Sequence, residues 1–159
     1  MDDIQIRNHL VESDVERLPL LTQETQFFNY EEVMIVDELV KHTLHQNSDD
    51  YQWIVIEKNQ TPIGFTCYGK IPGSEHSYDL YWIVVAKSQQ SKGLGKRLIE
   101  LTEIEVKKQN GAMLIAETSG KPLYEPTRNF YLRCGFIHEA TIRHFYAQND
   151  DKYFYVKRL

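Results

Sequence analysis

The sequence has little of what disulfide-bonded, metal-bound or membrane-spanning proteins need. It contains only two cysteines, Cys67 and Cys134, which lie far apart and outside any Cys-x-x-Cys or Cys/His ligand spacing. We therefore expect reduced, partly buried thiols, no disulfide and no bound metal. No stretch approaches the roughly 18 apolar residues of a membrane-spanning helix. The first residues include acids and no apolar run, which argues against a secretory signal. These absences predict a cytoplasmic protein without a membrane partner.

The chain also lacks an excess of basic residues. Its formal net charge is -5, with 18 Lys and Arg against 23 Asp and Glu, which argues against nucleic acid as a partner. Hydrophobic residues make up 42% and charged residues 26%, as in ordinary globular proteins. At 159 residues the chain is long enough for a core of its own. We expect a single domain over residues 1–159, without repeats or linkers.

Hydrophobic periodicity predicts alternating strands and helices. Strands are expected at residues 4–7, 53–57, 63–68, 77–85, 112–118, 136–146 and 153–157, and helices from Ser13, over about 31–45, from Leu94 to Asn110 and over about 127–134. The helix from Leu94 separates two strands, which should therefore be parallel in a right-handed βαβ unit. The expected fold class is α/β (α+β), with a mixed central sheet of about six or seven strands flanked by helices.

Three local patterns make finer predictions. Ser13 and Glu16 have the spacing of a capping box at the start of the first helix, which Pro19 should shorten or bend. The buried stripe of the third helix should consist of Leu94, Leu98, Leu101 and Ile104. Residues 148–151, which include Asp150 and Asp151, should form a solvated turn between the last two strands, with a contact from these two aspartates to a cationic acceptor as the alternative.

The segment from residue 90 to 97 has the properties of a phosphate-binding loop. It follows an apolar strand and leads directly into a helix, and Gly93 and Gly95 let the backbone approach a ligand closely. Lys92, Lys96 and Arg97 concentrate positive charge there in an otherwise acidic chain. On these residues alone, an ordinary tight turn between strand and helix is the alternative.

Two signatures together resemble the GNAT superfamily of acyl-CoA-dependent N-acyltransferases. The family's loop pattern Gln/Arg-x-x-Gly-x-Gly/Ala is matched by Gln90, Gly93 and Gly95. Its pattern aromatic-Tyr-x-x-x-Gly-Phe is matched by Phe130, Tyr131, Gly135 and Phe136. The expected order of elements agrees over essentially the whole chain. The resemblance implies a splayed parallel strand pair at the cofactor site, here residues 77–85 and 112–118.

The resemblance also implies acetyl-CoA as the cofactor and assigns residues to it. The backbone of Val84 and Val85 would pair with the pantetheine arm. The pyrophosphate would be held by the backbone N–H groups of Gln90, Ser91, Lys92, Gly93, Leu94, Gly95 and Lys96. Tyr131 occupies the family's position for the acid that protonates the departing thiolate, with a packed aromatic residue as the alternative.

Acetyl transfer to an amine also needs a base, because an alkylammonium with a pKa near ~10 is protonated at neutral pH. Asp79 stands at the position where several protein-acetylating members of the family carry a glutamate that acts as the base. It is the first candidate. Glu117, on the adjacent strand and facing the same side if the strands pair in register, is the second. A purely structural carboxylate is the alternative for Asp79.

The sequence therefore predicts an N-acetyltransferase. It would move an acetyl group from acetyl-CoA to a primary amine of a small molecule or amino-acid-like acceptor, by direct attack through a tetrahedral intermediate. Two alternatives stay open: an acetyltransferase for protein lysines or N-termini, and a non-catalytic acyl-CoA sensor. The sequence leaves open whether the protein is a monomer or a homodimer.

Overall fold

The computed structural model describes residues 2–159 and contains two compact units. The first comprises the residues up to Gly69 together with Trp82–Thr102, and the second comprises Lys70–Tyr81 and Glu103–Leu159. In chain order the elements are β1 (Ile4–Arg7), α1 (Asp14–Glu24), α2 (Tyr30–Gln46), β2 (Gln52–Lys58), β3 (Thr61–Lys70), β4 (Ser77–Val85), the 3-10 turn η1 (Lys87–Gln89), α3 (Leu94–Lys108), β5 (Met113–Ser119), the 3-10 turn η2 (Pro122–Tyr124), α4 (Glu125–Arg133), β6 (Ile137–Ala147) and β7 (Asp150–Arg158). The expectation of one domain over residues 1–159 stays a prediction.

The strands confirm the mixed α/β fold. Within residues 2–159 they form a seven-stranded sheet in the order β1-β2-β3-β4-β5-β7-β6, and β4 contributes residues to both units. The expected parallel pair is present, since Ser77–Leu80 of β4 pairs in parallel with Met113–Ala116 of β5. The pairs β1–β2, β2–β3, β5–β7 and β6–β7 are antiparallel. The splay expected beyond the parallel pairing stays a prediction.

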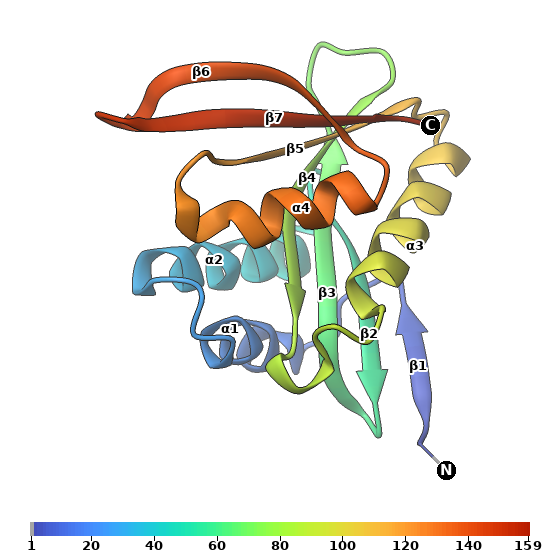
Figure 1. The fold of residues 1–159 in the computed structure, drawn as a ribbon. Helices are drawn as coiled ribbons and strands as arrows, with labels where there is room; N and C mark the ends of the chain where they lie inside the picture. The colour runs from blue at the N-terminus through green and yellow to red at the C-terminus, as the bar shows by residue number, and fades with distance from the viewer. Residues whose placement is uncertain (1) are drawn as a thin grey trace. The chain divides into compact units, whose positions relative to one another are not determined.

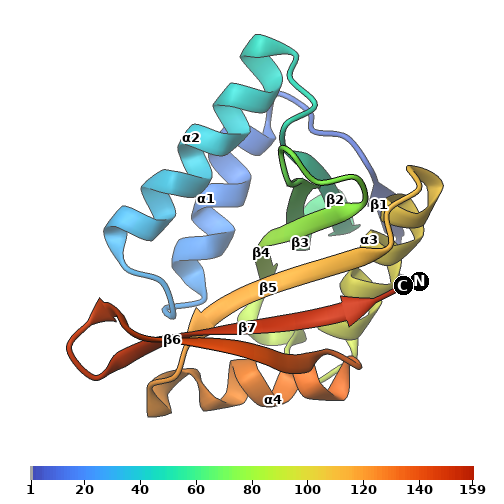
Figure 2. The same ribbon diagram turned by 90° about the horizontal axis from the view of Figure 1, so that it is seen from above.

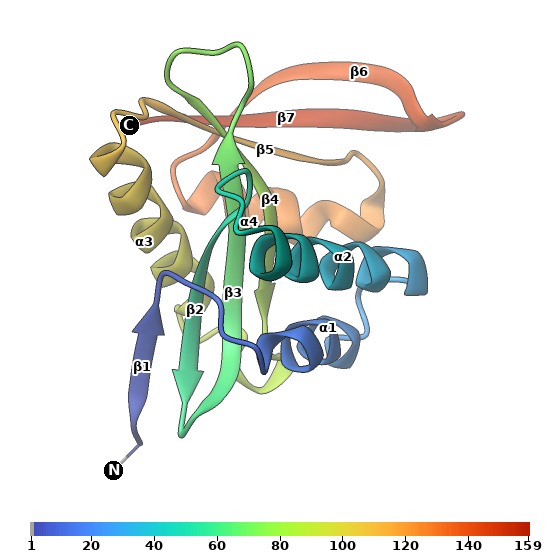
Figure 3. The ribbon, with the colours of Figure 1, turned by 180° about the vertical axis from the view of Figure 1, so that it is seen from behind.

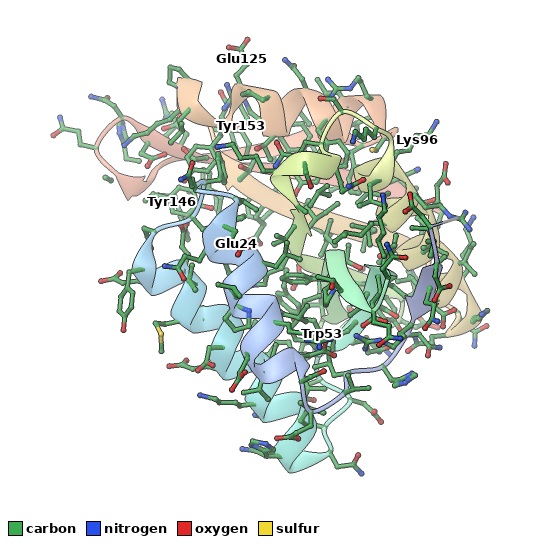
Figure 4. All side chains as sticks on the ribbon, turned by 90° about the horizontal axis from the view of Figure 1, so that it is seen from below. Glu24, Trp53, Lys96, Glu125, Tyr146 and Tyr153 are labelled. Carbon is green, nitrogen blue, oxygen red and sulfur yellow. The ribbon has the colours of Figure 1, made fainter. Side chains whose placement is uncertain are left out.

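In the first unit, helices cover both faces of the β2–β3 hairpin. Helices α1 and α2 lie on one face and the beginning of α3 on the other (Figures 1 and 3). The α1 and α2 face has a core in which Leu18 and Val36 pack with Trp53 and Phe65. Trp53 lies beside α1 in Figure 4. Successive residues of a strand point to opposite faces, so each strand of the hairpin supplies both layers.

In the second unit, α4 covers one face of the sheet formed by β5, β7 and β6 (Figure 2). The Tyr131 ring of α4 lies 5.7 Å from the Tyr155 ring of β7. The Arg128 guanidinium lies over the Tyr153 ring, 5.5 Å from its centroid, and donates to the carbonyl oxygens of Ser119 and Lys121. These contacts fix the segment between β5 and α4 against β7.

The start of the first helix differs from the predicted capping box. Ser13 makes no side-chain cap hydrogen bond, and the Asp14 carboxylate instead accepts the backbone N–H of Val11 at 2.8 Å. The capping box of this region stands at the start of α2, where the Asn29 side chain accepts from the Glu32 N–H and the Glu32 carboxylate accepts from the Asn29 N–H. Helix α1 continues through Pro19.

The buried face of α3 also differs from the predicted stripe. Ile104 is 46% exposed, whereas Leu98, Ile99, Thr102 and Val106 are buried. Thr102 donates to the Leu98 carbonyl oxygen and shares a 2.8 Å hydrogen bond with the Thr66 hydroxyl. A polar residue therefore replaces an apolar one on the buried face, because its hydroxyl is satisfied there.

The turn between the last strands is shorter than predicted, because β7 already begins at Asp150. Asp150 is buried, accepts a hydrogen bond from the Ser119 hydroxyl and lies 3.5 Å from the Lys121 ammonium. The expectation of a solvated turn is therefore wrong for Asp150. The β6–β7 pairing contains two register irregularities, between His138 and Ala140 and between Ile142 and Ala147 on β6.

Both cysteines are free in the structure, and both are buried rather than partly buried as the sequence predicts. None of the helices in the described part of the chain is both long and apolar enough to cross a membrane.

A buried ion-pair network joins three elements of the first unit. Arg7 at the end of β1 lies 3.0 Å from the Asp14 carboxylate of α1 and 2.8 Å from the Glu57 carboxylate of β2. Both carboxylates are almost fully buried, and 12% of the Arg7 side chain is exposed. The guanidinium therefore compensates two charges that would otherwise stand unpaired away from water.

Replacing Arg7 with methionine is expected to lower the free energy of unfolding by about 3 to 5 kcal/mol, because two buried carboxylates lose their cation. Urea denaturation followed by circular dichroism measures this loss. Lys58→Met is the control, since it removes the more exposed pair with Asp2 and should leave stability nearly unchanged. If both variants lose the same small amount of unfolding free energy, the Arg7 network stabilises the protein no more than an exposed ion pair does.

Candidate active site

The loop between β4 and α3 provides backbone donors for an anion. Ser91 and Gly93 have positive φ angles of 62° and 82°. The first hydrogen bond of α3 runs from the Arg97 N–H to the Gly93 carbonyl oxygen at 3.0 Å. The N–H groups of residues 94–96 precede this bond and have no acceptor within the helix, as in the first turn of any α-helix. This arrangement favours a phosphate group at the loop.

The surroundings of the loop are basic and open. Lys92, Lys96 and Arg97 are exposed, and Figure 4 shows Lys96 at the outside of the first unit. A Cβ added at Gly93 would meet nothing within 4 Å, so the backbone there can be approached directly. The residues present therefore fit the pyrophosphate that the sequence predicts for this loop.

Side chains hold the loop in place within the first unit. The Gln90 amide donates to the Val85 carbonyl oxygen at 3.1 Å and thereby joins the loop to the end of β4. The Lys87 ammonium donates to the Gln26 side chain at 2.8 Å, which joins η1 to the segment between α1 and α2. Gln90 therefore belongs to the loop pattern of the family and also stabilises the conformation of the loop through its side chain.

Tyr131 lies on α4 in the second unit and is 6% exposed. Its ring lies 5.4 Å from that of Phe136 and 5.6 Å from that of Phe130. Burial, with a smaller contribution from Cys134, raises the pKa of the Tyr131 phenol well above its ordinary value. The phenol therefore carries its proton at neutral pH.

The two candidate bases lie on neighbouring strands of the second unit and face the same side. The parallel register sets Asp79 of β4 beside Ile115 of β5, and Glu117 follows Ile115 by two residues. Side chains two residues apart on a strand share a face, so the predicted pair is brought together. Glu117 lies opposite Phe154 of β7, whereas Tyr131 packs against Tyr155, which points to the other face.

The Asp79 carboxyl is half-buried and has a perturbed proton affinity. Burial, and after it the negative charge of Glu117, raises the pKa of Asp79 from 3.8 to about 6, while the positive charge of Lys152 opposes the increase. A carboxyl with a pKa of about 6 exchanges its proton close to neutral pH, as a general base must.

Glu117 has a different environment. Its carboxylate is 2.7 Å from the Lys152 ammonium, and 39% of its side chain is exposed. Lys152 was not among the residues that the sequence singles out. The strict alternation of β7, with Lys152 and Phe154 on one face and Tyr153 and Tyr155 on the other, is the signal that could have indicated it.

No group of His, Cys, Asp or Glu side chains that could hold a metal ion occurs within residues 2–159. The loop between β4 and α3 and the pair of Asp79 and Glu117 are the chemical features from which a function is argued below.

Comparison with known proteins identifies the class. The sequence model of the Acetyltransferase (GNAT) family matches residues 15–136. A solved structure of a protein assigned to the GNAT family of acetyltransferases, from Desulfovibrio desulfuricans, is 36% identical with a TM-score of 0.95, over 98% of this chain and 99% of that one. The chain therefore belongs to the acetyltransferase (GNAT) family.

More distant structures share the fold. The ribosomal-protein-S18-alanine N-acetyltransferase from Escherichia coli is 19% identical with a TM-score of 0.75, over 98% of this chain and 94% of that one. An aminoglycoside 6'-N-acetyltransferase solved with coenzyme A is 16% identical with a TM-score of 0.76, over 97% of this chain and 96% of that one. No protein of curated function matches the chain in sequence.

Replacing Gly93 with alanine is expected to weaken coenzyme A binding about tenfold, equal to ~1.4 kcal/mol, because the added Cβ would stand where a phosphate approaches the backbone. Gly73→Ala is a matched control, since Gly73 has the same φ of 82° and equally open surroundings. Both variants carry the same backbone strain, of about 1 kcal/mol. Isothermal titration calorimetry with coenzyme A measures both; equal affinities would argue against a phosphate at this loop.

Proposed function

We propose that this chain is an acetyl-CoA-dependent N-acetyltransferase whose acceptor is a primary amine of a small molecule or an amino-acid-like compound. Membership of the acetyltransferase (GNAT) family supports acetyl transfer. The observation that carries the finer proposal is the half-buried carboxyl of Asp79, because its pKa of about 6 suits the deprotonation of an amine.

The first unit would bind the nucleotide part of acetyl-CoA. The backbone N–H groups from Gln90 to Lys96 would hold the pyrophosphate, with Lys92, Lys96 and Arg97 adding positive charge. The Val84 and Val85 backbone would pair with the pantetheine arm. Since the Val85 carbonyl oxygen already accepts from Gln90, pairing there would use its second lone pair or displace the Gln90 side chain.

When bound, acetyl-CoA supplies the acetyl group as a thioester. In the proposed reaction the ammonium of the acceptor gives a proton to the Asp79 carboxylate, and the neutral amine attacks the thioester carbonyl carbon. A C–N bond forms and the C–S bond breaks. The Tyr131 phenol, which burial keeps protonated, would give its proton to the departing thiolate. The second proton of the attacking nitrogen would then return to the Tyr131 phenolate, which leaves a neutral amide and restores the phenol.

The acceptor class rests on comparison and chemistry together. The related aminoglycoside enzyme acts on a small amine, as its name states, and this supports a small-molecule acceptor for the present chain. A protein N-terminus is the second candidate, because the E. coli relative acetylates an alanine of a ribosomal protein. Thiol release from acetyl-CoA over a panel of small amines, amino acids, aminoglycosides and peptides separates the two. Binding of acetyl-CoA without release for any acceptor would instead favour a sensor. Monomer or homodimer, and a cytoplasmic location, remain predictions.

The pH dependence of kcat/KM is expected to report Asp79. Its activity requires the ionised carboxylate, so kcat/KM should rise with pH up to about 6 and level off above it. Asp79→Asn should lower kcat/KM by about 10²-fold or more and abolish this acidic limb. If Asp79→Asn retains full activity and Glu117→Gln loses the limb, Glu117 is the base and the proposal is wrong on this point.

Replacing Tyr131 with phenylalanine is expected to lower kcat by about 10²-fold with little change in stability, because only the proton donor is lost and the ring packing is kept. Tyr155→Phe is the matched control, since Tyr155 is also buried and its ring contacts that of Tyr131. Steady-state kinetics and thermal denaturation of both variants test this. Equal kcat values for the two variants would assign Tyr131 a packing role alone.

A further inference from the structure

Lys152 is a charged residue that the reaction described above does not use. It lies on β7 opposite Ser119 of β5, while Glu117 of β5 lies opposite Phe154. Ser119 and Glu117 share a face of β5, so Lys152 and Glu117 are diagonal neighbours on that face, within reach of a long side chain. The two side chains do meet, because the Lys152 ammonium forms an ion pair of 2.7 Å with the Glu117 carboxylate.

The ammonium is held from several sides. Only 13% of the Lys152 side chain is exposed, which is little for a lysine. Its Nζ atom lies 4.0 Å from the centroid of the Phe145 ring of β6 and 5.3 Å from that of the Phe154 ring. An ammonium over aromatic faces and against a carboxylate is fixed in position by attraction from each.

Charged groups on two neighbouring strands act on the Asp79 carboxyl. β5 presents Glu117 and β7 presents Lys152. β6 presents Tyr146, which faces Glu117 and, through burial and that negative charge, has a raised pKa, so it is neutral near pH 7. Two carboxylates are thus accompanied by one ammonium. Without it, two like charges would face each other, and one carboxyl would hold its proton to higher pH.

We propose that Lys152 is the positioning residue of the carboxylate pair: its ammonium holds Glu117 in an ion pair and thereby leaves Asp79 as the carboxylate that accepts the proton of the acceptor amine. This inference rests on the proposed function for the role of Asp79 in turnover. It assigns Lys152 no contact with the reacting atoms. Its effect is exerted through Glu117 and through its charge.

Opposite substitutions should move the acidic limb of kcat/KM in opposite directions. Lys152→Met keeps the apolar stem and removes the charge, so the limb should shift to higher pH by about one unit. Lys152→Arg keeps the positive charge, so its limb should stay at the pH of the unaltered protein. Glu117→Gln removes the like charge and should shift the limb to lower pH. Lys108→Met is the control, since its pair with Glu105 has the same 2.7 Å distance but is far more exposed, and the limb should not move.

A second measurement does not depend on activity. The carboxyl ¹³C resonance of Asp79 can be titrated in the full chain without substrates, with Asp79→Asn used to assign it. The midpoint of the titration should rise in Lys152→Met and fall in Glu117→Gln. In Lys152→Arg, which keeps the positive charge, it should stay near that of the unaltered protein. Unchanged midpoints in all three variants would overturn the inference.

The two measurements separate the two claims. If the resonance midpoint moves as expected but kcat/KM keeps its acidic limb in Asp79→Asn, the inference about Lys152 holds and Asp79 is not the base. If Asp79→Asn abolishes the limb but neither the limb nor the resonance responds to Lys152→Met, the proposed function holds and Lys152 is only a packing residue.

Discussion

The parallel pairing of β4 with β5 is the constraint on which the candidate site depends. Parallel neighbours need a crossover, which here is α3, and the crossover begins at the glycine-containing loop after β4. The same pairing sets Asp79 beside Ile115 and thereby gives Asp79 and Glu117 a common face. An antiparallel arrangement would need only a short turn and would provide no helix start for a phosphate. The helix start after β4 and the common face of Asp79 and Glu117 thus each depend on the direction of these strands.

Strand β7 divides the chemistry of the second unit between its two faces. Tyr153 and Tyr155 point to the side that α4 covers, where the surroundings are aromatic and a phenol keeps its proton. Lys152 and Phe154 point to the side of the carboxylates, where a charge has a partner. The proposed acid and the proposed base therefore occupy environments of opposite character, one aromatic and one charged.

The order of elements, the parallel pair, the loop and the hairpin of β2 and β3 could be predicted from the sequence, because each depends on periodicity or turn residues within a short window. The errors share another origin. The buried face of α3 depends on the bond between Thr66 and Thr102, and the burial of Asp150 on its bond with Ser119. The alternation of β7 indicates the face on which Lys152 lies, but its ion pair with Glu117 on another strand is seen only in the structure. Such contacts join residues more than 30 positions apart, and no local pattern encodes them.

The two arms of the β6–β7 hairpin differ in how they respond to a change in chain length. The irregularities of the pairing lie on β6, whereas β7 pairs with β5 in unbroken register from Lys152 to Arg158. A residue gained or lost between Ile142 and Ala147 falls where the ladder is already interrupted, so β7 keeps its register with β5. The same insertion or deletion within β7 exchanges the faces of all residues beyond it, so that a tyrosine meets the carboxylates and the lysine meets α4. A length change in β6 therefore preserves which side chains of β7 face the carboxylates, whereas a length change within β7 reverses them.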